Sequence, residues 1–321
     1  MKCSLYMTAA LLPMVVSAAG TSMRSPVSGY VFDAEKGIIR PLNGLPGAAL
    51  LGGAMEAPEA LAKVFFGPRQ ATAVAVSRPG ASYHVRLDGS NATFTALPDL
   101  QMNPDLVAFT PDGKSAVVYE AATRRYRLLT GLSDSPAAGE ATALPELPGE
   151  ITALALNPAA VTLAAAVKTG DAAAVYAINL ETVETSFISD ALSVETLSFS
   201  DSGSLLFADR GSDRVLTATS SAAGWQVSVV ADGRDGLAGP AGAEFSGGAV
   251  VILSGSEVVL RQAGVLTRIA LPVKALRLAP MAAPGLLYLD AKDELLGAAP
   301  LHLLDLSGEA RVVFVPAGGA Q

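Results

Sequence analysis

The chain repeats a unit of roughly forty residues from about residue 60 to its C-terminus, a period typical of stacked or radial supersecondary units. The clearest copies cover residues 106–119, 151–167 and 194–209. In each copy a short apolar strand is followed by a turn rich in Pro, Asp, Asn, Gly or Ser, and then by a second apolar strand. This repetition constrains the architecture more strongly than any single residue does.

The repeats predict an all-β chain. Apolar alternation and short apolar runs are frequent, whereas no segment of helical length keeps a 3.6-residue apolar period. Apolar residues make up 50% of the chain and aromatic residues only 6%, so we expect thin, tightly packed sheets. The turns at the repeat centres are spaced about forty residues apart, as in four-stranded propeller blades. These centres are Ser77, Thr110, Asn157, Ser200, Ser246 and Ala279. The sequence therefore predicts a single β-propeller domain over residues 20–321.

Six four-stranded groups can be placed along the chain, after a hairpin at residues 30–42 and a weak strand near residues 48–51. The groups cover residues 63–97, 105–147, 151–189, 194–230, 240–271 and 274–315. Dividing the length by the repeat predicts seven blades, with six as the alternative. We expect the N-terminal strands to close the ring as the outer strands of a blade that joins the chain ends, which leaves no open sheet edge.

The first nineteen residues have the pattern of a secretory signal. Lys2 precedes an apolar stretch of about a dozen residues, which is too short to span a membrane, and small residues lead up to Ala19. Removal of this signal would also remove Cys3, the only cysteine, and with it any disulfide or thiolate metal site. We therefore expect a secreted or periplasmic bacterial protein without a transmembrane segment.

The net charge argues against nucleic acid as a partner. It is −8 for the whole chain, and loss of the signal with Lys2 makes it one unit more negative. Such a chain lacks the basic surface that neutralises phosphates.

Three segments resemble bacterial propeller repeats. Residues 207–216 are similar to the strand–turn–strand element of NHL-type and YVTN-type propellers, and residues 232–242 to the loop between NHL blades. The segment Phe-Thr-Pro-Asp-Gly-Lys-Ser at 109–115 resembles a turn shared by WD40-like, YVTN and lactonase-like propellers. The closing Trp-Asp pair of WD40 repeats is absent, because Trp225 is followed by Gln226. The resemblance implies the fold and no particular activity.

Strands of a blade alternate in direction, so its loops sort onto two faces. Loops between second and third strands, and the connections between blades, share one face, which we call the loop face. Turns between first and second strands share the opposite turn face, where Asp112 and Gly113 are predicted to be structural turn residues. The candidate binding residues are charged side chains expected on the loop face: Asp209, Arg210, Asp213, Asp232 and Asp235. No calcium-loop run of acidic residues is present, so no metal is predicted.

The sequence offers no catalytic set and predicts no cofactor. His84 is expected to face solvent beside Arg86, and His302 to lie at an edge or half-buried; their spacing does not fit a zinc site. Neither a Gly-x-Ser-x-Gly elbow nor a Ser–His–Asp arrangement is found. The basic cluster 124–127 is expected to be a solvated strand face.

These features favour a non-enzymatic scaffold whose loop face binds a protein or peptide. The alternative is a lactonase-like or lyase-like propeller enzyme with a divalent metal at the channel mouth. A third class is a sensor or assembly subunit whose propeller mainly contacts another chain. A propeller fold by itself decides among none of these functions.

Overall fold

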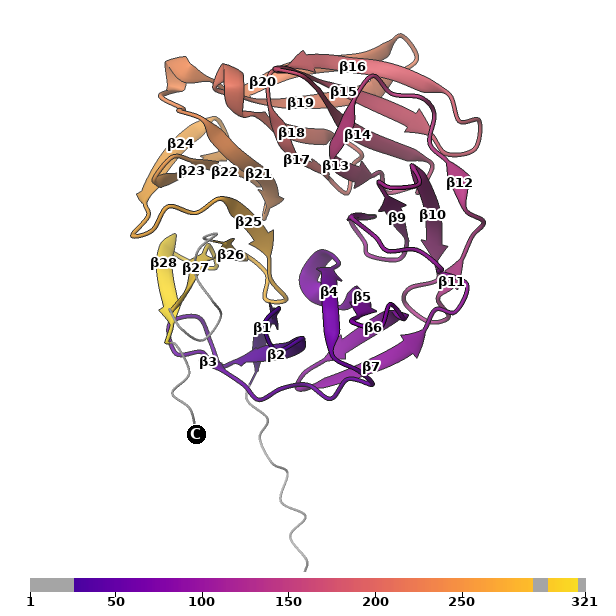
Figure 1. Ribbon diagram of the computed structural model, residues 1–321. Helices are drawn as coiled ribbons and strands as arrows, with labels where there is room; N and C mark the ends of the chain where they lie inside the picture. Colours follow the sequence, from indigo (N-terminus) through magenta and orange to yellow (C-terminus); the bar gives the residue numbers. More distant parts are fainter. Residues whose placement is uncertain (1–25, 291–299, 317–321) are drawn as a thin grey trace, which may run out of the picture.

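Seven antiparallel sheets form a ring in the computed structural model, which describes residues 26–290 and 300–316 (Figure 1). The seven-bladed β-propeller predicted from the repeats is confirmed. The predicted signal peptide, residues 1–19, lies outside the described residues. We number the blades 1 to 7 in chain order.

Each blade is built from consecutive strands. Blade 1 has β1 (Val27–Asp33), β2 (Ile38–Asn43) and β3 (Leu50–Leu51). Blades 2 and 3 contain β4 (Leu61–Phe66), β5 (Thr72–Ser77), β6 (Ser82–Asp88) and β7 (Asn91–Ala96), then β8 (Leu106–Phe109), β9 (Ala116–Glu120), β10 (Arg125–Thr130), β11 (Ala137–Ala138) and β12 (Thr142–Ala143). Blades 4 and 5 contain β13 (Glu150–Leu156), β14 (Thr162–Thr169), β15 (Ala172–Asn179) and β16 (Thr185–Ala191), then β17 (Val194–Phe199), β18 (Leu205–Asp209), β19 (Arg214–Ser221) and β20 (Gly224–Ala231).

The last two blades follow the same plan. They contain β21 (Pro240–Ser246), β22 (Ala249–Ser254), β23 (Glu257–Gln262) and β24 (Val265–Ala270), then β25 (Arg277–Pro280), β26 (Leu286–Asp290), β27 (Leu301–Asp305) and β28 (Arg311–Val315). Three short 3₁₀ turns interrupt the strands: η1 (Pro68–Gln70), η2 (Arg210–Ser212) and η3 (Gly233–Asp235). Only blade 3 splits its outer strand, since β11 and β12 both pair with β10.

The core lies between neighbouring blades. The cluster between blades 4 and 5, for example, packs Ala164, Ala166 and Val175 against Leu205 and Phe207, all buried. Small side chains allow the sheets to approach closely, and a protein interior packs at near-crystalline density. The Ala-, Val- and Leu-rich composition therefore supplies the side chains that fill the space between blades.

Blade 1 lacks the strand nearest the axis. The turn after β1 lies on the loop face, because the Leu61 amide donates to the Gly37 carbonyl at 2.9 Å. The start of β1 lies on the turn face, where the Ala283 amide donates to the Ser28 carbonyl at 2.9 Å. In the other blades the second and fourth strands run from the turn face to the loop face, and only the second is followed by two further strands of its sheet. Thus β1, β2 and β3 occupy the second, third and fourth positions, as the predicted outer strands of a closing blade.

The N-terminal strands close the ring between blades 2 and 7, as predicted, without a strand from the C-terminus in their sheet. The last described strand, β28, pairs with β27 inside blade 7, and no described C-terminal residue pairs with the sheet of blade 1. The inner edge of β1 is satisfied in another way, by the side chain of Gln70. Its Oε1 accepts from the Tyr30 amide at 2.7 Å, and its Nε2 donates to the Tyr30 carbonyl at 2.9 Å.

This primary amide therefore makes the two hydrogen bonds that a neighbouring strand would supply. Gln70 is only 3% exposed, and η1 contacts both β1 and β25, so it bridges the place of the missing strand. Arg69 and Gln70 have left-handed φ angles of 53° and 49°. Such angles cost about 1 kcal/mol each outside glycine. A side chain on Gly29 would collide with Met281, so the seam between blades 7, 1 and 2 is closely filled.

We expect Gln70→Ala to lower the free energy of unfolding by about 2–4 kcal/mol, because it leaves a buried amide and a buried carbonyl of Tyr30 without partners. Urea unfolding followed by circular dichroism measures this change. The matched control is Gln101→Ala at an exposed site, which should stay within about 0.5 kcal/mol of the parent protein. Equal stability of the two variants would show that the seam is held by something else.

Candidate functional site

The five predicted binding residues come together on the loop face of blades 5 and 6. They lie in the segments 209–213 and 232–239, which we call the blade 5–6 rim. Asp213 Oδ1 accepts from the Gly239 amide at 2.6 Å, and this links the two segments directly. The Arg210 side chain lies beside Gly239 and pairs with Glu195 at 3.7 Å. The structure therefore brings the two predicted segments into contact, although their residues differ in what they do.

Asp209 is a structural residue within this rim. It is fully buried, and its Oδ1 accepts from the amides of Leu192 and Ser193, each at 3.0 Å. Its Oδ2 accepts from Ser212 and from Arg214. Burial alone would raise the pKa of Asp209, but these hydrogen bonds outweigh it and hold the pKa below its ordinary value. Asp209 thus ties the connection between blades 4 and 5 to the second strand of blade 5.

Other blades repeat this device near the end of the second strand. A polar side chain there bonds to the connection that enters the blade, which fixes the loop face. The pairs are Glu120 with the Asn103 amide (2.8 Å), Thr169 with the Pro148 carbonyl (2.7 Å) and Ser254 with the Ala238 amide (2.9 Å). A polar residue that ends each apolar second strand is the sequence signal for these contacts.

The segment 232–239 is preformed by its own hydrogen bonds. Asp232 Oδ1 accepts from the Arg234 amide at 2.8 Å, and Asp235 Oδ2 accepts from the Asp232 amide at 3.1 Å, which together make a capping box. Gly236 follows with a φ of 78°, which favours glycine. Arg268 of β24 donates to the Asp235 carbonyl from the neighbouring blade.

The tip of this segment presents Arg234. Its guanidinium pairs with Asp232 Oδ2 at 2.6 Å, yet its side chain is 90% exposed. The hydrogen bonds from the Arg234 side chain and amide lower the pKa of Asp232. The rim therefore offers a charged group that is held in place and accessible.

Sequence reasoning missed one residue beside the axis, Glu244 of the inner strand β21. It lies half-buried near Ser198 of β17 and Arg277 of β25. Burial raises its pKa to about 7, although Arg277 and Ser198 act in the opposite direction. Neither the Ser198 hydroxyl nor that of Thr196 reaches hydrogen-bonding geometry with any described group. The sequence signal was present, since Glu244 is the single charge in the strand 240–246.

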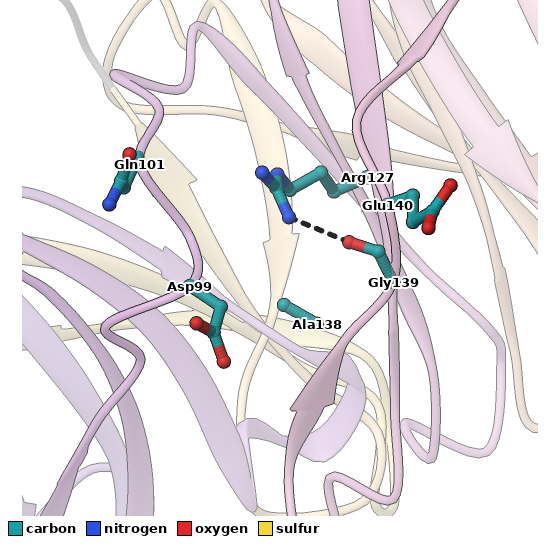
Figure 2. A pocket seen from close by; sticks show the side chains of 6 residues that line it. All are labelled: Asp99, Gln101, Arg127, Ala138, Gly139 and Glu140. Carbon is teal, nitrogen blue, oxygen red and sulfur yellow. Dashed lines mark hydrogen bonds between the residues drawn. The ribbon is translucent and has the colours of Figure 1, made fainter.

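An open hollow of about 300 Å³ lies where the outer strand of blade 3 is split (Figure 2). Arg127 reaches across it, and its Nη1 donates to the Gly139 carbonyl at 2.8 Å. Figure 2 shows the Glu140 carboxylate directed away from the guanidinium. Arg127 is half-buried and Arg125 is exposed, so the predicted solvated face holds only for part of the basic cluster.

The prediction that His84 faces solvent was wrong. His84 is 4% exposed, because neighbouring blades cover both faces of β6 and alternation along the strand does not mark a wet side. Burial lowers its pKa, with the Leu132 backbone acting against this and Arg86 adding to it. His302 is also buried, at 8% exposure.

The predicted turn role of Asp112 is confirmed. Thr110 donates to Asp112 Oδ1 at 2.7 Å, and the Lys114 amide does so at 3.1 Å. Gly113 has a φ of 72° in the same turn.

Within residues 26–290 and 300–316, no three His, Cys, Asp or Glu side chains gather closely enough to hold a metal ion. None of the helices in these two ranges has the length and apolarity required to cross a membrane.

Comparisons with known proteins identify the fold. No protein family matches the chain, and no curated protein matches it in sequence. A functionally unknown protein from Desulfotomaculum acetoxidans DSM 771 is similar in structure, with a TM-score of 0.62 and 12% identity over 91% of this chain and 100% of that one. Virginiamycin B lyase from Staphylococcus aureus has a TM-score of 0.53 and 12% identity over 80% and 84%.

A third similar structure is PorZ, a surface component of the type-IX secretion system of Porphyromonas gingivalis. Its TM-score is 0.57, with 12% identity over 92% of this chain and 38% of that one. At these identities the similarity shows the propeller fold alone.

We expect Asp209→Ala to lower the free energy of unfolding by about 2–4 kcal/mol, because it removes a buried acceptor and leaves two loop amides without a hydrogen-bond partner. Amide hydrogen exchange should also speed up at Leu192 and Ser193. Asp201→Ala, at an exposed turn of the same blade, is the control and should change neither quantity. Unchanged exchange at both amides would contradict the role assigned to Asp209.

Glu244 should make stability depend on pH. Its pKa is higher in the folded protein than in the unfolded chain, so its stabilising effect is complete below about pH 4.5 and is lost as the pH rises through about 7. Glu244→Gln should therefore be more stable than the parent protein at pH 8, by about 1–3 kcal/mol, and much closer to it at pH 5. Urea unfolding at both pH values tests this. Glu140→Gln at an exposed site is the control, and identical shifts for both variants would refute the assignment.

Proposed function

We propose that this protein is an exported, non-enzymatic β-propeller that recognises a protein or peptide partner with its blade 5–6 rim. The observation that carries the proposal is the preformed segment 232–239, which is fixed by its capping box and by Arg268 while Arg234 remains accessible. A binding loop that is already ordered loses little conformational entropy on association.

The rim also has charges of both signs to offer. Arg234 and Arg210 are 90% and 45% exposed, and Glu195 beside Arg210 is 54% exposed. Exposed charges at the border of an interface contribute mainly to orientation and association rate. A partner with a complementary pattern of acidic and basic groups would dock in one orientation on this rigid surface.

Export is supported by the sequence of residues 1–19, with its basic start, apolar stretch and small residues. Mass spectrometry of the native protein should find a mature N-terminus near Ala19 or Gly20. An uncleaved protein retained inside the cell would contradict this part of the proposal.

The partner-binding test uses the double variant Arg210→Glu/Arg234→Glu. A partner that co-purifies with the parent protein from the exported fraction is first identified and purified. We expect the double variant to bind it at least about tenfold more weakly, with a slower association rate, because two rim charges are reversed. Isothermal titration calorimetry and stopped-flow kinetics measure these quantities.

The control for this experiment is Arg86→Glu, which reverses a charge on the third strand of blade 2, far from the rim. It should leave the affinity within about twofold of the parent value. Equal weakening by both variants, or none by the double variant, would show that the blade 5–6 rim is not the binding surface.

A further inference from the structure

The outermost strand of each blade is a free sheet edge, and in most blades it is poorly suited to pairing. The outer strand of blade 1 is very short, and that of blade 3 is split. A charged residue lies within three of the others: Asp190 in β16, Arg268 in β24 and Arg311 in β28. Short edges, interruptions and charges are the usual protection against unwanted strand pairing.

The outer strands of blades 2 and 5 have none of these features, and that of blade 5 is the longer of the two. The blade 5 strand, β20, has eight residues, Gly-Trp-Gln-Val-Ser-Val-Val-Ala, the longest of the outer strands described, and contains neither charge nor proline. Among the described strands it pairs with β19 alone. The register is unbroken from Gly224 to Val229 and shifts only beyond this point.

The register shows which backbone groups of β20 are free. Ser221 pairs with Gly224 across a two-residue turn, and inward and outward residues alternate along an antiparallel strand. The amides and carbonyls of Gln226 and Ser228 therefore point toward β19. Those of Trp225, Val227 and Val229 point to the open edge.

The same three residues carry the apolar side chains. Val227 and Val229 are 37% and 49% exposed, and Trp225 is half-buried against the core between blades 4 and 5. At every second residue of β20, the open edge therefore has a free backbone donor and acceptor, and the same residue carries an apolar side chain. Only an extended chain has matching groups at this spacing.

We propose that the free edge of β20 binds an extended segment of the partner protein as a fifth strand of blade 5. This inference rests on the proposed function and specifies the chemistry of the partner: a strand-forming segment with apolar residues at alternate positions. The two surfaces are continuous, since β20 ends at Ala231 and the rim begins again at Asp232. A segment paired with β20 would therefore extend toward the preformed segment 232–239.

Trp225 allows a direct test, because it is the only tryptophan in the chain. The probe is the peptide Lys-Val-Thr-Val-Thr-Val-Lys, whose lysines suit a protein of negative net charge. We expect a saturable change in Trp225 fluorescence with a dissociation constant of about 1 mM or tighter. Amide exchange should slow at Trp225, Val227 and Val229, whereas Gln226 and Ser228 should not change further.

The control peptide is N-methylated at alternate residues and cannot donate along the edge, so it should have no effect. A lack of protection at the three outward amides at a probe concentration of about 5 mM would overturn the inference. Sedimentation gives a second check. A dimer of the free protein that disappears when the edge is blocked would assign the edge to a second copy, and would overturn the inference too.

The variant Val227→Pro blocks the edge. Proline is tolerated where an edge amide faces solvent, so blade 5 should fold while losing one outward donor. Val229→Lys, which adds a charge, is the second variant, and Val227→Thr keeps the donor as the control. We expect the first two to weaken binding of the probe and of the purified partner at least about tenfold, and the third to leave both within about twofold.

The two proposals can fail separately. If Arg210→Glu/Arg234→Glu weakens partner binding and Val227→Pro does not, the edge inference is wrong and the rim proposal stands. If Val227→Pro weakens binding and the rim variant does not, the partner binds through the strand edge and the rim proposal is wrong.

Discussion

The ring depends on how blade 1 closes without an inner strand. Every blade of a propeller buries both faces against neighbours, so one open junction would expose apolar surface on two blades. Here the Gln70 amide, with its paired bonds to Tyr30, replaces the backbone of the missing strand. The strained backbone at Arg69 and Gln70 is tolerated because the surrounding contacts of η1 with β1 and β25 hold it in place.

Closure of the ring fixes the loop face. In blades 3 to 6 one polar side chain near the end of the second strand holds the incoming connection, as Asp209 does for residues 192 and 193. The hydrogen bonds of these side chains are made within the protein, so they hold the loop face in shape and are not available to a partner. Arg234 and the outward groups of β20 are the complementary case, because they are accessible and sit on the framework that the first set makes rigid.

The sequence predicted the blades well because their turns are local signals. Blade 5 was placed at 194–230 and its strands run from Val194 to Ala231. Features that arise from contacts between distant residues were missed or misjudged. Gln70 and Tyr30 are forty residues apart, and nothing near either marks a missing strand. The exposure of His84 was predicted wrongly, because alternating polar and apolar residues indicate exposed positions only in a sheet with one solvent-exposed face. The two rim segments lie in contact, yet the hydrogen bonds within them could not be predicted from residue type.

Glu244 is a half-buried carboxyl on the inner strand of blade 6. The hydroxyls of Ser198 and Thr196, on the inner strand of blade 5, make no hydrogen bond with any described group. A buried carboxyl with a raised pKa is a cost to stability that simple packing would remove. It lies on β21, which begins directly after the segment 232–239. The cost therefore falls on the strand that directly follows the proposed binding loop.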